Sequence, residues 1–275
     1  SQGPDWEERT YDTSTEVLSQ IRTDLFVHAQ LQRNSLTLAL EPTSGLLTPE
    51  LRRQTPDEGV HVWLPAGGNC TLWTGPDSDS EHPACVWHEG NLEEITEQLT
   101  STSIRFERIL GWFPTELEPP ISGQLAELSG LLAPAGRLLL ALSLRSKAPR
   151  LSSLLAADLL DEPTKQAFLE AEEEIYQPLQ KKDGTLTKQA LDERLQSGYS
   201  VAVCSAKPYT TELQLSANRI QEWLEPRNNT GYFGKLRLLL DSATFQKIAQ
   251  AFKQHAPHKT HPWSRTVLHL VVVRQ

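Results

Sequence analysis

Short apolar runs alternate with segments of helical spacing along most of this chain, and this alternation constrains the fold more than any other feature. Seven runs rich in Leu, Val and Ile predict β-strands at residues 36–40, 60–64, 84–88, 106–111, 137–143, 199–205 and 266–273. Parallel strands need crossover connections, which helices supply, so the alternation predicts a mostly parallel α/β sheet. Strands such as Arg137–Ser143 are apolar on both faces, which is typical of strands buried between two helix layers.

The helices are predicted from apolar residues three or four positions apart. They lie at 15–32, 47–54, 92–99, 121–132, 152–176 and 186–196. Pro163 is expected to divide the fifth segment into two helices, and Thr187 is the expected N-cap of the sixth. After Ser205 strands and helices no longer alternate, because two helices, at 213–224 and 243–255, precede the last strand. We therefore predict a single domain over 1–275, with a leading helical segment over 1–35 and a helical insertion over 207–262.

Composition limits where the chain can work. No apolar run approaches the roughly 18 residues that a membrane span needs, so no membrane partner is expected. Three cysteines form no disulfide framework, which indicates a reducing compartment and a cytoplasmic location. The chain does not begin with Met, so we expect it to be a fragment or a processed form.

Charge is distributed unevenly along the chain. From residue 235 to residue 275 there are seven basic residues and one acidic residue, a net charge of +6, although the whole chain carries −9. This stretch can contact phosphates or an acidic partner, or it can be a solvated face that balances the acidic body. The candidate nucleic-acid or partner contacts are Lys247, Lys253, Lys259 and Arg265.

The order of these elements resembles the class I S-adenosylmethionine-dependent methyltransferases. Leu131–Ser143, "LLAPAGRLLLALS", is similar to the Leu-x-Pro-x-Gly turn that precedes the fifth strand of that family. Phe106–Leu110 is similar to its fourth strand. The resemblance implies a Rossmann-like methyltransferase fold, with a seven-stranded, mostly parallel sheet and an antiparallel last strand.

Three longer segments resemble a methyltransferase-like domain that is fused to RarA/MgsA-type AAA ATPases in cyanobacteria. They are "QRNSLTLALEPTSGLLTPELRRQTPDEGVHVW", "EAEEEIYQ" and "HPWSRTVLHLVVVR". Relatives carry Leu-Leu-Thr and Pro-Trp where this chain has Leu46–Thr48 and Pro262–Trp263. The resemblance implies an AAA ATPase domain of the same parent chain or assembly as partner, and a role with DNA or replication proteins in replication and recombination. The chain has no G-x-x-x-x-G-K-[ST] phosphate loop, so no ATP hydrolysis is expected.

The segment "SLTLALEPTSGLLTPE" matches the place where the methyltransferase family carries its glycine-rich cofactor loop. The family has an acidic residue and then a G-x-G-x-G turn, whereas this chain has Ala39 and then Glu41, Thr43 and Gly45. The Glu41 carboxylate is expected to repel the carboxylate of the cofactor. The second strand lacks the acid that binds ribose, and Asn91 stands where an acid usually lies near the adenine.

These departures predict a degenerate, non-catalytic module with no cofactor and no catalytic residue. One alternative is an active S-adenosylmethionine-dependent methyltransferase with an atypical loop, in which Glu41, Gly45 and Asn91 line the cofactor pocket at the carboxyl ends of the strands. Another alternative is a nucleic-acid-binding module without a small ligand.

Two histidine-containing segments are considered as metal sites and rejected. Cys85 and His88 are expected on opposite faces of a strand, and His82 lies roughly 20 Å from His88 at about 3.3 Å per residue. His255, His258 and His261 recur at every third position, but the prolines beside them favour a loop. We predict no metal site.

Overall fold

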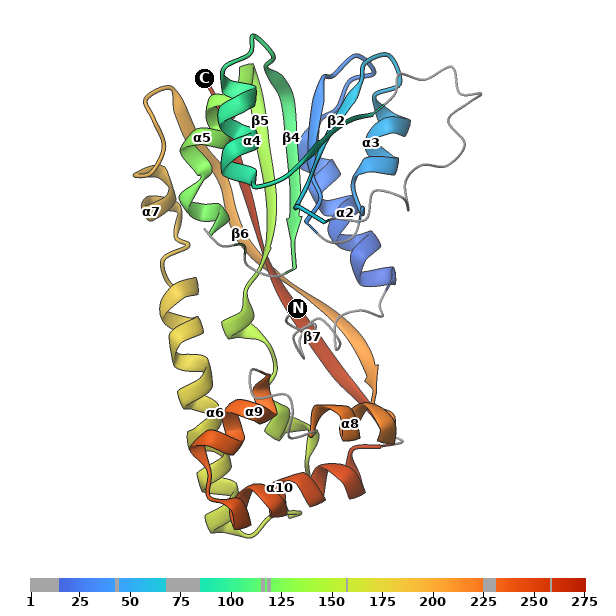
Figure 1. Cartoon of the computed structure of the whole chain (residues 1–275), viewed down its shortest axis with the longest axis vertical. Coiled ribbons are helices and arrows are strands. Elements are labelled where there is room, and N and C mark those ends of the chain that lie inside the picture. The colour runs from blue at the N-terminus through green and yellow to red at the C-terminus, as the bar shows by residue number, and fades with distance from the viewer. Residues whose placement is uncertain are drawn as a thin grey trace. The chain divides into compact units, whose positions relative to one another are not determined.

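The computed structural model describes residues 15–42, 45–67, 85–114, 117, 120–156, 158–224, 231–257 and 259–275 (Figure 1). The chain divides into two compact units. The sheet unit comprises residues 16–143, 186–207 and 267–275, and the helical unit includes residues 144–185 and 208–266. The prediction of a single domain over 1–275 stays a prediction.

The described residues form a seven-stranded sheet with the order β3-β2-β1-β4-β5-β7-β6. The strands are β1 (Thr37–Leu40), β2 (Val60–Leu64), β3 (Val86–Glu89), β4 (Phe106–Phe113), β5 (Leu132–Ser143), β6 (Tyr199–Gln214) and β7 (Thr260–Arg274). The pairs β1–β2, β2–β3, β1–β4 and β4–β5 are parallel, and β7 runs antiparallel to β5. This is an α/β, Rossmann-like methyltransferase fold, which confirms the predicted fold class.

Strand order also positions the site. From β1 the sheet grows outward in both directions, to β2 on one side and to β4 on the other. In open α/β sheets, ligands bind at such a switch point, outside the carboxyl ends of the strands. A ligand site is therefore expected among the residues that follow β1 and its neighbours.

The helices of the sheet unit begin close to the predicted positions. They are α2 (Thr15–Ala29), α3 (Thr48–Gln54), α4 (Leu92–Thr100), α5 (Leu125–Gly130) and α7 (Lys188–Asp192), with a 3₁₀ turn η3 (Ile121–Gly123). Thr187 caps α7 as predicted, because its side chain accepts a hydrogen bond from the backbone N–H of Ala190. The C-terminal end of α2 is bound to the sheet: Arg137 donates to the carbonyl of His28 at 3.0 Å, and Arg108 donates to that of Gln30 at 3.2 Å.

The helical unit contains four helices and two short 3₁₀ turns among its described residues. They are α6 (Glu162–Asp183), α8 (Ala217–Trp223), α9 (Tyr232–Leu239), α10 (Ser242–His255), η4 (Arg145–Lys147) and η5 (Leu151–Leu154). Aromatic side chains form its core, where Phe252 makes edge-to-face contacts with Phe168 and Phe233, at centroid distances of 6.1 and 5.3 Å.

Several predicted boundaries move. α6 begins at Glu162 with Pro163 in its first turn, where the missing N–H costs nothing, and continues past Tyr176 to Asp183. The predicted helix at 213–224 is wrong at its start, because β6 continues to Gln214 and α8 begins only at Ala217. In this outer part of β6, Tyr209 and Leu213 are buried between exposed residues, which is the two-residue period of a strand. Residues 1–14, within the predicted leading segment, and Ala84, the predicted start of the third strand, lie outside the described residues.

Candidate functional site

Glu41 follows β1 directly, at the switch point of the sheet. Its side chain is 2% exposed and is directed at the N-terminus of α3. One carboxylate oxygen accepts hydrogen bonds from the backbone N–H of Leu47 at 2.6 Å, from the backbone N–H of Thr48 at 2.8 Å and from the Thr48 hydroxyl at 3.0 Å. Glu41 therefore satisfies the first free N–H groups of α3 across the loop, a role usually taken by a local N-cap residue.

The electrostatics of Glu41 fit this internal role. Burial raises the pKa of its carboxyl group, and the hydrogen bonds from Thr48 and Leu47 partly offset that rise. Gly45 is buried in the same loop and has φ of +55°, a conformation that favours glycine. Thr43 lies outside the described residues. The Glu41 carboxylate thus binds the protein backbone.

A cavity of about 240 Å³ lies beside the carboxyl ends of β2 and β3. It is lined by Trp63, Pro65, Ala66, Gly90, Asn91, Leu92, Leu117 and Gln124. The Trp63 indole donates to the Gly90 carbonyl at 3.1 Å, and the Asn91 side chain caps α4 by accepting from the backbone N–H of Glu93 at 2.8 Å. None of the described residues that line the cavity is charged. The structure therefore brings Asn91 to this cavity but does not bring Glu41 or Gly45 to it.

The S-adenosylmethionine cofactor can be tested against these residues. The N-terminus of α3 is filled by a carboxylate of the chain itself, and the cavity at β2 and β3 offers no carboxylate to ribose hydroxyls among its described lining residues. Among the described residues, the carboxylate and the ribose of this cofactor therefore lack the partners that the methyltransferase family provides.

His61 on β2 and His88 on β3 form a pair that sequence reasoning missed. Their ring nitrogens Nδ1 and Nε2 lie 2.9 Å apart, and the rings stack with centroids at 5.1 Å. Burial, and secondarily the charge of His88, lowers the pKa of His61 to about 4, and burial also lowers the pKa of His88. The register pairs Trp63 with His88, so the two histidines lie on one face of adjacent strands. Pairing the predicted strands 60–64 and 84–88 in this register would have placed His61 beside His88.

The four predicted basic contact residues do not form one common site. Lys247 is paired with Asp161 at 2.7 Å, and Arg265 is only 6% exposed, because β7 buries its side chain. Lys259 is exposed, and Lys253 is exposed on α10. The role of these four residues in contacting a nucleic acid or a partner stays a prediction.

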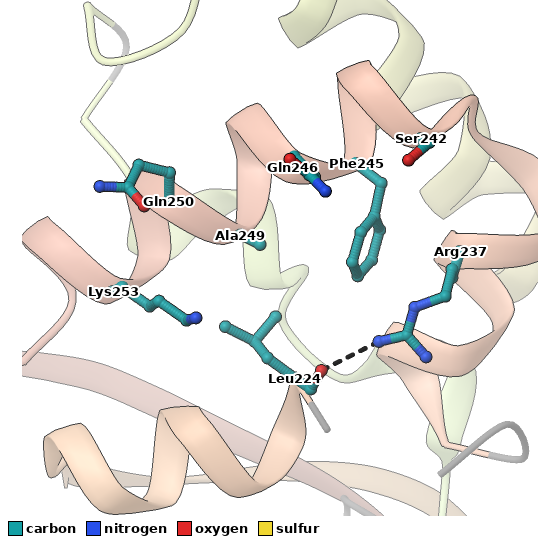
Figure 2. A pocket seen from close by; sticks show the side chains of 8 residues that line it. All are labelled: Leu224, Arg237, Ser242, Phe245, Gln246, Ala249, Gln250 and Lys253. Carbon is teal, nitrogen blue, oxygen red and sulfur yellow. Dashed lines mark hydrogen bonds between the residues drawn. The ribbon is translucent and has the colours of Figure 1, made fainter. Parts of the chain in front are cut away.

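Lys253 belongs to a second cavity, of about 500 Å³, within the helical unit (Figure 2). Leu224, at the end of α8, Arg237 on α9 and one side of α10 line it. The α10 residues are Ser242, Phe245, Gln246, Ala249, Gln250 and Lys253. Arg237 donates to the Leu224 carbonyl at 2.9 Å.

The helical unit also buries an acid. Glu172 on α6 is 1% exposed, and one of its oxygens accepts hydrogen bonds from the Ser152 backbone N–H at 3.0 Å and from the Tyr232 hydroxyl. Burial raises the pKa of Glu172, with these hydrogen bonds opposing the rise, and burial also raises the pKa of Tyr232. Sequence reasoning missed this contact.

Within the described part of the chain, no three His, Cys, Asp or Glu side chains are grouped so that they could hold a metal ion. His82 and His258 lie outside that part. In the same part of the chain, no helix is both long and apolar enough to cross a membrane.

No protein-family model matches the chain, and no curated protein matches it. Solved structures are similar at low identity. A protein of Bacillus halodurans assigned to the methyltransferases is 12% identical, with a TM-score of 0.47, over 92% of this chain and 98% of its own. The precorrin-6y C5,15-methyltransferase of Geobacter metallireducens is 10% identical, with a TM-score of 0.43, over 96% and 94%. The cyclopropane synthase MmaA2 of Mycobacterium tuberculosis is 13% identical, with a TM-score of 0.41, over 94% and 84%. The assignment of the fold rests on the order and direction of the strands.

Proposed function

We propose that this chain is a degenerate, non-catalytic methyltransferase-like module. It is attached to an AAA ATPase that acts in replication and recombination, in the same parent chain or assembly, and it works by contacting a protein partner or DNA. The observation that carries the non-catalytic part is the position of Glu41. Its carboxylate binds the first backbone N–H groups of α3, which are the groups that an anionic ligand at this end of the sheet would need.

The charge of the cofactor supports the same conclusion. The cofactor S-adenosylmethionine carries a carboxylate, and the loop offers it another carboxylate in place of free N–H donors. Displacing the Glu41 carboxylate from the N-terminus of α3 would leave a buried acid without its hydrogen bonds, which costs about 1–3 kcal/mol or more. A ligand would have to supply that free energy before it gained any affinity.

Calorimetric titration of the chain with S-adenosylmethionine and S-adenosylhomocysteine tests this proposal. We expect no binding at millimolar ligand, for the wild type and for the Glu41→Gln variant, which keeps an oxygen acceptor for the backbone. Micromolar binding, or methyl transfer to any acceptor, would contradict the proposal.

The cavity at the ends of β2 and β3 favours a second function, an active methyltransferase with an atypical loop. It has an indole and an asparagine where a base could bind, although 240 Å³ lies below the roughly 300–1,000 Å³ of ordinary ligand pockets. In this second function Asn91 contacts the ligand. Asn91→Ala should then weaken the binding that the titration detects by about tenfold. Ser216→Ala is the matched control, since Ser216 caps α8 in the same way and does not line the cavity.

Attachment to the ATPase has a separate test. Adding the purified chain to a RarA/MgsA-type AAA ATPase should change its rate of ATP hydrolysis, with or without DNA. An unchanged rate together with no complex in size-exclusion chromatography would remove the partnership and leave the cofactor result unaffected.

A further inference from the structure

The cavity of the helical unit has a positively charged lining that no part of the proposed function uses. One side of α10 supplies residues 242, 245, 246, 249, 250 and 253, which are spaced three or four positions apart and therefore share a face. Leu224 and Arg237 complete the described lining. The volume of about 500 Å³ is within the range of sites for small ligands.

Arg237 is held in place before any ligand arrives. Its Nη2 donates to the Leu224 carbonyl, and its guanidinium carbon lies 4.8 Å from the centre of the Phe245 ring (Figure 2). Its Nη1 is buried and makes no hydrogen bond with a described residue. A buried donor of a charged group that lacks an acceptor is costly, and an ion or a water is the usual explanation. Arg237 is thus an ordered cation in the wall of the cavity.

Lys253 is the second cation. It is exposed and has no ion pair among the described residues, whereas Lys247 on the same helix is paired with Asp161. Figure 2 shows the side chains of Lys253 and Arg237 both directed toward Leu224. Ser242, Gln246 and Gln250 add neutral donors to the same lining.

No described residue that lines the cavity is acidic. Asp241, which precedes Ser242, is engaged as the N-cap of α10, where it accepts from the backbone N–H groups of Ala243 at 3.0 Å and Thr244 at 2.9 Å and from the Thr244 hydroxyl at 2.6 Å. Glu225, which follows Leu224, lies outside the described residues. The site thus offers two cations and several neutral donors to an acceptor-rich ligand.

We propose that this cavity binds a phosphoryl group. A planar guanidinium that is fixed in orientation and an ammonium on a flexible stem together match the several oxygens of a phosphate. The phosphate can belong to a small phosphorylated compound or to the backbone of a nucleic acid, and the recognition chemistry is the same for both. This inference does not depend on the cofactor argument at β1.

Titration calorimetry of the whole chain with inorganic pyrophosphate at low ionic strength tests the proposal. We expect binding that Arg237→Gln and Lys253→Gln each weaken by about tenfold, the usual effect of removing a charge-assisted hydrogen bond. The matched control is Lys235→Gln, which removes an exposed lysine of α9 that does not line the cavity. It should leave the affinity unchanged.

Each outcome decides for or against the site. No binding at millimolar pyrophosphate, or an equal effect of Lys235→Gln and Lys253→Gln, would overturn the proposal. Since Lys253 is exposed, its variant should fold normally even if Arg237→Gln does not. If the chain binds a single-stranded oligonucleotide, if pyrophosphate displaces it and if Lys253→Gln weakens its binding, nucleic acid is the source of the phosphate. Pyrophosphate binding without oligonucleotide binding would identify a small compound.

Discussion

At the scale of single residues, Glu41 decides how the end of β1 is built. Its carboxylate takes three hydrogen bonds that hold the loop to α3. Glu41→Ala leaves two buried N–H groups without an acceptor, so we expect the free energy of unfolding to fall by about 1–3 kcal/mol. Glu41→Gln keeps an oxygen for these donors, and the raised pKa of Glu41 means that burial already opposes its charge. The glutamine variant should therefore lose less than the alanine variant.

Urea unfolding of both variants measures this difference. Equal losses would mean that the charge of Glu41, and not its oxygen, holds the loop. The sequence predicted that the cofactor loop is degenerate, from Glu41 and the missing glycines. It could not predict what Glu41 binds instead, because the partners at positions 47 and 48 depend on the path of the loop in space.

At the scale of elements, buried strands were predicted well because apolar runs such as Val60–Leu64 are buried along their whole length. The outer parts of β6 and β7 were missed, since exposed polar residues interrupt their apolar pattern. The histidine pair was missed because it depends on the register between β2 and β3, which neither strand encodes alone.

The start of β5 is an element whose geometry makes a prediction. Phe106 pairs with Leu132 and Arg108 pairs with Arg137, so four residues of β5 lie opposite Glu107, and Ala135 among them has φ of +59°. A Cβ added at Gly136 would lie 2.7 Å from the carbonyl oxygen of Ala133, a backbone atom that cannot move aside easily. Gly136→Ala should therefore lower the free energy of unfolding by about 1–3 kcal/mol.

Ala135→Gly is the control for this turn. Glycine adopts a positive φ without strain, so the variant should be neutral or stabilising by a few tenths of a kcal/mol, after the entropy that glycine adds to the unfolded chain. Thermal unfolding followed by circular dichroism compares the two. If both variants behave alike, the turn at Ala135 and Gly136 is not the constraint that its geometry indicates.

At the scale of the whole molecule, each of the two units buries ionisable groups, and acidification has opposite effects on stability through the groups of the two units. The sheet unit buries His61 and His269, and burial lowers the pKa of both. The helical unit buries Glu172, and burial raises its pKa. Between pH 7 and pH 5 the unfolded chain binds more protons at these histidines than the folded chain does, so acidification destabilises the fold through them. At Glu172 the folded chain binds more protons, so the same acidification is stabilising.

His61 provides the sharpest test of this balance. Its pKa falls from about 6.5 in the unfolded chain to about 4 in the folded chain, so it should account for about 1–2 kcal/mol of the stability lost between pH 7 and pH 5. Urea unfolding at both pH values should show a loss that is smaller by this amount in His61→Gln than in the wild type. Glu172→Gln should enlarge it, because the variant no longer gains a proton at that position as the pH falls. If His61→Gln loses as much stability as the wild type between the two pH values, the stacked pair on β2 and β3 does not resist protonation.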